Sequence, residues 1–130
     1  MNRLFVTLYV GLAALFCGSA AVAQPQPAER ASITDLRTLF VTAIDSPDGE
    51  AHGILAGDMA ETISRHFKTN SPIYVDVTTE RRYTQTSCSR LKVAIWQDGV
   101  VLPGATAPKK QTFEMGINYC RNGLPPASLT

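Results

Sequence analysis

Apolar residues in two segments of this chain recur every three or four positions, which is the period of an amphipathic helix. The first segment predicts a helix over 33–45, with the following residues on its apolar face: Ile33, Leu36, Leu39, Phe40, Ala43 and Ile44. Ser32 and Asp35 have the spacing of a capping box at its start, and the turn-forming residues 46–49 end it. The second segment predicts a helix over 58–67.

From position 73 onward the hydrophobic period shortens to two residues, which is typical of half-buried strands. One strand is predicted over 73–78, a second within 83–97 and a third over 112–120. Asp98 begins a turn signal at the end of the second strand. Residues 100–111 are either a long loop or a loop that contains a short edge strand.

These elements together predict an α+β fold. Two N-terminal helices are expected to pack on one face of a small antiparallel sheet of three or four strands. The expected organisation is a flexible leader over 24–31, a single domain over 32–124 and a loosely ordered tail over 125–130.

The first 23 residues have the pattern of a cleavable signal peptide. Arg3 precedes an apolar run over 4–16, and Ala21 and Ala23 form the small-residue pattern that signal peptidase cuts. The run is shorter than the roughly 20 residues that span a bilayer, and no later segment is long and apolar enough. The sequence therefore predicts a periplasmic or secreted protein with no transmembrane segment in its mature form.

Export changes how the three cysteines are interpreted. Cleavage removes Cys17, and the remaining pair in an oxidising compartment predicts one disulfide between Cys88 and Cys120. The strand alternation places Cys88 on the face of Arg90, and Cys120 on the face opposite Met115. Both cysteines are therefore expected to lie on the side of the sheet away from the main core.

The charges of the expected mature chain balance, but they are unevenly distributed. Residues 24–80 contain nine acidic and four basic side chains, whereas residues 81–130 contain seven basic and two acidic ones. The two halves either form faces of opposite sign that orient a partner, or neutralise each other within one fold. Balanced charge together with export disfavours nucleic acid as a partner.

His52 and His66 are the only histidines in the sequence, and a hydrolase would need one of them as a general base. His52 is expected in a loop rich in Ser and Asp, and His66 at the end of the second predicted helix. The sequence contains no spacing typical of zinc, calcium or phosphate-binding sites. We therefore predict no catalytic residue, no metal and no cofactor.

A basic and aromatic cluster is the strongest candidate for a partner-binding surface. Its members are Arg81, Arg82, Tyr83, Arg90, Lys92 and Trp96. Aromatic and arginine side chains are the usual anchors of protein interfaces. The competing interpretation is a solvated strand face, charged to discourage pairing between sheet edges.

Residues 87–93 and 118–126 resemble small exported proteins encoded in the transfer regions of conjugative plasmids and related type IV secretion loci. The similarity also takes in residues 46–53 and Gly57, so it extends over most of the expected mature chain. It implies an accessory role in the periplasm of a Gram-negative bacterium. The expected partner is a protein of the cell envelope, either a component of the secretion channel or a cell-wall enzyme.

The sequence therefore favours a non-enzymatic binding or accessory protein. One alternative is an inhibitor or immunity-like protein that acts on a cell-wall hydrolase. A second alternative is a small hydrolase that uses His52.

Overall fold

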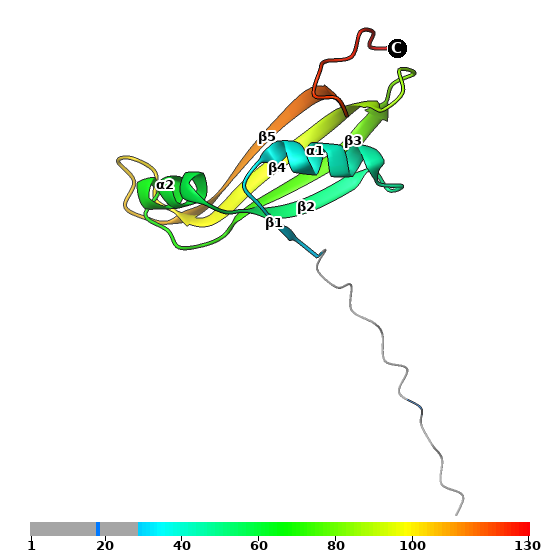
Figure 1. Cartoon of the computed structure of the whole chain (residues 1–130). Coiled ribbons are helices and arrows are strands. Elements are labelled where there is room, and N and C mark those ends of the chain that lie inside the picture. The colour runs from blue at the N-terminus through cyan, green and yellow to red at the C-terminus, as the bar shows by residue number, and fades with distance from the viewer. Residues whose placement is uncertain (1–17, 19–28) are drawn as a thin grey trace, which may run out of the picture.

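The computed structural model describes Gly18 and residues 29–130, which form one five-stranded sheet and two helices (Figure 1). In chain order the elements are β1 (Ala31–Ile33), α1 (Leu36–Asp45), β2 (Glu50–Leu55), α2 (Asp58–His66), β3 (Ile73–Arg82), β4 (Cys88–Val100) and β5 (Lys109–Cys120). The strands lie side by side in sequence order. Apart from Gly18, the signal peptide predicted over 1–23 lies outside the described residues.

The predicted arrangement of two N-terminal helices on an antiparallel sheet is wrong. A strand, β1, precedes the first helix, and a second strand, β2, separates the two helices. The sheet is mixed, because β1 runs parallel to β2 while the other three strand pairs are antiparallel. It has five strands rather than the three or four that were expected.

Small core-facing residues explain why β2 was missed. The inward positions of this strand are Ala51, Gly53 and Leu55, of which only Leu55 has a large apolar side chain. Gly53 lies directly beneath α1, where an added Cβ would be 3.0 Å from Leu39 Cδ1 and 3.1 Å from Ala31 O. The close approach of α1 therefore requires glycine at position 53. This glycine interrupts the alternation of large apolar residues that would otherwise have predicted a strand.

Both helices are shorter than predicted. Ile33 belongs to β1, and α1 begins at Leu36 after Asp35, whose carboxylate accepts a hydrogen bond from Arg37 N at 2.9 Å. Because Ser32 lies in β1, the predicted capping box does not form. Helix α2 ends at His66, and Phe67 is its C-cap.

The hydrophobic core lies between α1 and one face of the sheet (Figure 1). Its buried residues are Ile33, Leu39, Phe40, Ala43, Ile44, Ala51, Leu55, Ile73, Val75, Val77, Leu91 and Val93. Helix α2 has no fully buried residue, although Ala60 and Ile63 pack against this core. The other face of the sheet therefore carries no described helix.

The last three strands are longer than the alternation predicted at one or both ends. Residues 83–87 form the loop before β4, and β4 extends to Val100 through a register shift after Gln97. Gly99 lies in this irregularity with φ +67°, so the turn signal marks a bulge rather than the end of the strand. Strand β5 begins at Lys109, which leaves 101–108 as the hairpin loop.

The disulfide between Cys88 and Cys120 is confirmed. The two residues face each other across β4 and β5 with their Cα atoms 4.0 Å apart, and both are buried. They lie outside the core cluster beneath α1, as the strand alternation predicted. The tail lies against the loop before β4, where Thr84 N donates to Thr130 O at 2.8 Å.

Candidate functional site

The sheet face opposite α1 brings together most of the polar and aromatic side chains with chemical potential. We call it the helix-free face, and its principal residues are His52, Tyr74, Asp76, Thr78, Arg81, Tyr83, Arg90, Lys92, Trp96, Lys110, Thr112, Glu114 and Asn118. Except for Tyr83, which follows β3, they occupy strand positions that alternate with the core residues. Arg30, immediately before β1, adds its side chain to this face.

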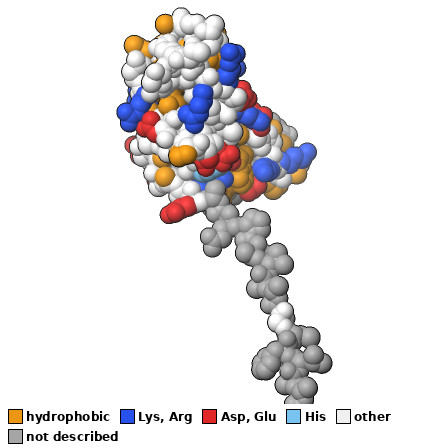
Figure 2. All heavy atoms as spheres, turned by 90° about the vertical axis from the view of Figure 1, so that its right-hand side faces the viewer, with side chains coloured by type: hydrophobic (Ala, Val, Ile, Leu, Met, Phe, Trp, Pro, Cys, Tyr) orange, Lys and Arg blue, Asp and Glu red, His pale blue; other side chains and the backbone are white. Residues whose placement is uncertain are grey.

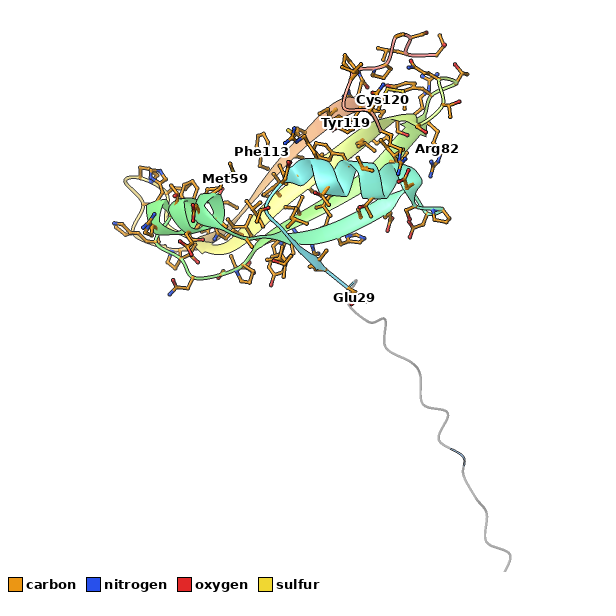
Figure 3. The ribbon with its side chains drawn as sticks, viewed as in Figure 1. Glu29, Met59, Arg82, Phe113, Tyr119 and Cys120 are labelled. Carbon is orange, nitrogen blue, oxygen red and sulfur yellow. A yellow bond between two sulfur atoms is a disulfide. The ribbon has the colours of Figure 1, made fainter. Side chains whose placement is uncertain are left out.

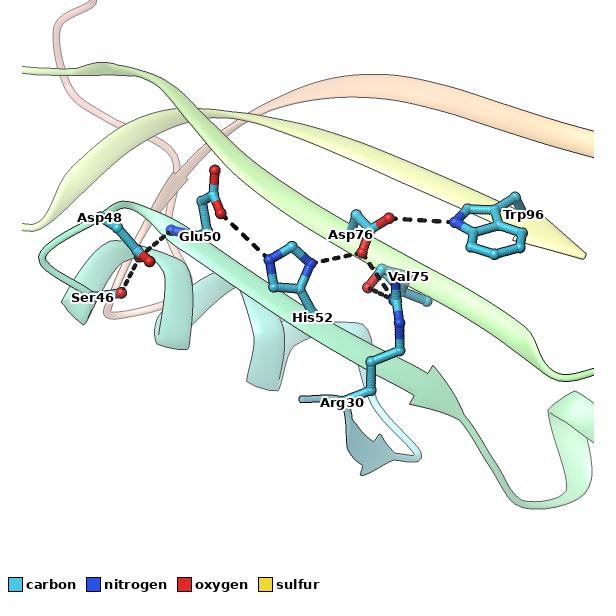
Figure 4. Close-up of polar contacts among 8 residues, drawn as sticks. All are labelled: Arg30, Ser46, Asp48, Glu50, His52, Val75, Asp76 and Trp96. Carbon is cyan, nitrogen blue, oxygen red and sulfur yellow. Dashed lines mark hydrogen bonds and ion pairs between the residues drawn. The ribbon is translucent and has the colours of Figure 1, made fainter. Parts of the chain in front are cut away.

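Asp76, on the central strand β3, is the centre of a hydrogen-bonded cluster on the helix-free face (Figure 4). Its Oδ1 lies 2.7 Å from His52 Nδ1 and 2.9 Å from Arg30 Nη1. Trp96 Nε1 donates to the other carboxylate oxygen, Oδ2, at 3.3 Å. One carboxylate thus joins side chains from β2, β4 and the segment before β1.

The surroundings of Asp76 favour its ionised form. Burial acts to raise the pKa of Asp76, but hydrogen bonds from His52, Arg30 and Trp96 together hold that pKa below its usual range. Its side chain is 28% exposed, so water screens the interaction with Arg30 only in part. Asp76 is therefore a carboxylate throughout the neutral pH range.

His52 is held by carboxylates on both sides of its ring. Its Nδ1 contacts Asp76, and its Nε2 lies 3.4 Å from Glu50 Oε2. A general base needs one ring nitrogen directed at a nucleophile or a substrate proton. Within residues 29–130, no hydroxyl or thiol is hydrogen-bonded to this ring. The His52 side chain therefore links β2 to β3 through its hydrogen bond to Asp76.

Two aromatic rings and two cations lie beside Asp76. Tyr74 and Trp96 are register partners whose rings stack with centroids 4.1 Å apart. Arg30 Cζ lies 4.9 Å from the Tyr74 centroid, and Lys110 Nζ lies 4.2 Å from the Trp96 centroid. Cations at these distances are attracted to the aromatic faces. This end of the helix-free face is a compact aromatic and cationic surface.

Trp96 is therefore one predicted partner-binding residue on the helix-free face, and four others lie toward the opposite end of the same face. Arg81 Cζ lies 5.6 Å from the Tyr83 centroid, and Tyr83 Oη donates to Asn118 Oδ1 at 2.6 Å. Arg90 donates to the same Asn118 oxygen at 3.3 Å. Lys92 contacts a carboxylate of β5, with its Nζ 3.6 Å from Glu114 Oε1.

Arg82, the sixth predicted residue, lies on the α1 side of the sheet (Figure 3). Its guanidinium donates to Ile44 O at 3.1 Å and to Ser46 O at 2.9 Å, at the carboxyl end of α1. A β-bulge between Thr79 and Arg81 sets which of the two adjacent arginines faces the helix. Arg82 therefore stabilises the fold, and the structure separates it from Arg81.

Sequence reasoning missed Arg30, Tyr74, Asp76 and Lys110. The alternation over 73–78 already placed Tyr74 and Asp76 on a polar face, which was the available signal for them. Arg30 falls in the predicted leader, and only the tertiary structure shows that it reaches β3. No comparable signal exists for it in the sequence.

Other candidate sites are less developed. A cavity of about 550 Å³ lies between α2 and residues 68–73, away from the Asp76 cluster. His66 lies outside the helix-free face, with its ring centroid 4.9 Å from that of Phe67. The described part of the chain contains no group of three metal-ligating side chains, and neither of its helices is long and apolar enough to cross a membrane.

Comparison with known proteins adds no identification. No protein-family model, curated protein or solved structure matched the chain.

Proposed function

We propose that this protein is a non-enzymatic binding protein that recognises a protein partner through its helix-free face. The observation that carries the proposal is the Asp76 cluster. Its titratable groups bind one another, Trp96 and Lys110 lie beside them, and Arg81 and Tyr83 lie toward the opposite end of the same face. Such an arrangement provides interface anchors and leaves no described nucleophile beside His52.

The proposed setting is the periplasm, where the protein would serve as an accessory to conjugation or type IV secretion. The disulfide is compatible with an oxidising compartment, since such bonds are rare in the cytosol. The signal-peptide pattern and the resemblance to exported transfer-region proteins support the same setting.

The charge on the surface favours a specific partner over a bulk polyanion. Lys and Arg side chains are interspersed with Asp and Glu on the face that Figure 2 shows. The acidic and basic halves of the sequence are joined by ion pairs, Asp45 with Arg121 at 3.0 Å and Glu80 with Arg90 at 3.8 Å. A surface of mixed sign selects partners by complementary pattern.

The inhibitor alternative receives less support from the described loops. Inhibition of a hydrolase by loop insertion needs a free carboxylate, and the described connections between elements contain only Asp35 and Asp48. Asp35 bonds Arg37 N, and Asp48 bonds the Ser46 hydroxyl and Glu50 N. Both carboxylates therefore accept hydrogen bonds from residues of their own turns.

Charge reversal on the helix-free face tests the proposal. The variant Arg81→Glu/Lys110→Glu changes one cation over Tyr83 and one over Trp96. Affinity capture from envelope extracts of the native host should lose the partner with this variant. The matched control, Arg65→Glu/Lys68→Glu, makes the same charge change in and just after α2 and should retain the partner.

Both variants alter exposed positions, so their unfolding free energies should stay within about 1 kcal/mol of the parent protein. Equal capture by the two variants would contradict a binding role for the helix-free face.

A further inference from the structure

Within residues 29–130, no strand pairs with the outer edge of β5, which is long. It has 12 residues, whereas β1 at the opposite edge has 3. Residues 111–119 contain one charged side chain, Glu114, and no proline. Phe113 is 61% exposed and projects from β5 beyond the cover of both helices (Figure 3). Because sheets usually protect such edges with charge, proline or a covering element, this edge is suited to pairing with another strand.

The disulfide identifies which backbone groups point outward from this edge. A Cα separation of 4.0 Å between Cys88 and Cys120 is typical of a non-hydrogen-bonded pair. Cys120 N accordingly points away from β4 and donates to Leu124 O at 3.1 Å. The register between the strands is unbroken from Cys120 to Gln111. The even-numbered residues 112–118 therefore direct their amides and carbonyls outward.

We propose that two copies of this chain pair through β5 as antiparallel strands, with a two-fold axis at Met115. In this register Phe113 faces Ile117 of the second copy on the α1 side of the sheet. Glu114 faces Gly116 of the second copy, and their outward backbone groups form hydrogen bonds. The dimer buries the exposed Phe113 ring and joins the two sheets into one.

Charge complementarity favours a second copy of this chain as the partner that pairs with the edge of β5. The Arg90 guanidinium lies across Gly116, where an added Cβ would be 2.7 Å from Arg90 Cζ. Lys92 is the register partner of Gly116 on β4. Glu114 of one copy, placed opposite Gly116 of the other, therefore meets two cations in a position that a side chain at Gly116 would obstruct.

The same charges disfavour neighbouring registers. An axis at Glu114 places two carboxylates directly opposite each other, and an axis at Gly116 brings two Arg90 guanidinium groups together. An axis at Phe113 sets Lys110 opposite Gly116 and its Arg90. Like charges that face each other across a strand pair are destabilising, so these charges favour the axis at Met115 over the axes at Phe113, Glu114 and Gly116.

Sedimentation equilibrium of the purified protein tests the dimer. The parent protein should be a dimer, and Glu114→Arg should raise the dissociation constant about tenfold or more by facing Arg90 of the second copy. The charge swap Glu114→Arg/Arg90→Glu should restore dimerisation. A parent protein that stays monomeric over the accessible concentration range would overturn the proposal.

Cysteine substitution tests the register without relying on folding stability. Met115→Cys places two thiols across the axis in the same kind of pair as Cys88 and Cys120, so a covalent dimer should form on oxidation. The adjacent variant Glu114→Cys is the control, and it should give little covalent dimer. Equal crosslinking of the two variants, or none in a dimeric Met115→Cys protein, would overturn the proposed axis.

Discussion

Asp76 shows how one residue organises a surface made from distant parts of the chain. It lies on β3 and accepts hydrogen bonds from His52 on β2, Trp96 on β4 and Arg30 before β1. Arg30 also donates to Gly53 O at 3.3 Å, so it links the backbone of β2 to the side chain of Asp76. Loss of the carboxylate should therefore loosen several contacts at once.

The variant Asp76→Asn should lower the free energy of unfolding by about 1 to 2 kcal/mol at neutral pH, because the charge that binds Arg30 and His52 is lost. The pKa of Asp76 is lowered in the folded protein. Its ionisation therefore stabilises the fold above the unfolded pKa of about 4, and this contribution is lost as pH falls through the folded value. Urea unfolding at several pH values measures the effect.

The difference between parent and Asp76→Asn should therefore shrink toward zero as the solution is acidified below about pH 4. The control background Glu61→Gln removes an exposed carboxylate of α2 outside the Asp76 cluster, and the same pH-dependent effect of Asp76→Asn should remain in it. A difference that is constant with pH would show that Asp76 acts through shape rather than charge.

At the scale of elements, side-chain alternation in the sequence predicted β3, β4 and β5. It did not predict β1 and β2. Large apolar residues marked the inward faces of β3, β4 and β5. Strand β2 was hidden because Gly53 gives α1 room to approach, and β1 was hidden because three residues are too few to show a period.

The candidate site was predicted in part for the same reason. Trp96 and Lys92 were identified because side chains alternate regularly between the two faces along an unbroken strand. The bulge after Thr79 determines which of the two adjacent arginines, Arg81 or Arg82, faces α1. No local pattern shows that the Arg82 side chain reaches the carboxyl end of α1. Arg30 depends on a tertiary contact with Asp76, which a local pattern does not encode.

Replacement of Arg82 separates its role from that of Arg81. Arg82→Ala should destabilise the protein by about 1 kcal/mol, because the last carbonyl groups of α1 lose a cationic donor. Arg81→Ala, its neighbour on the helix-free face, should cost less and is the matched control. Urea unfolding of both variants gives the comparison, and equal losses would contradict the assignment of Arg82 to α1.

At the scale of the whole molecule, the disulfide joins the ends of β4 and β5 on the side away from α1. The core beneath α1 does not include either cysteine. The loop before β4 and the tail after β5 meet near the same end, where Arg121 N donates to Ser87 O at 2.9 Å. This end of the molecule is therefore stabilised by a covalent bond rather than by the main core.

Removal of the disulfide should lower the free energy of unfolding by about 3 to 4 kcal/mol, as the chain-entropy model gives for a cysteine separation of 32 residues. The double variant Cys88→Ala/Cys120→Ala and the reduced parent protein should lose similar amounts in urea unfolding. A loss below about 1 kcal/mol would mean that the surrounding contacts alone hold this end together.

Site-specific photocrosslinking in the native host is the most direct test of partner binding by the helix-free face. A photoreactive residue at Thr78 lies exposed on the helix-free face, and the same residue at Thr38 lies exposed on α1 as a matched control. We expect a crosslinked envelope protein from position 78 and none from position 38. The same crosslinked protein from both positions, or from position 38 alone, would rule out the helix-free face as the binding surface.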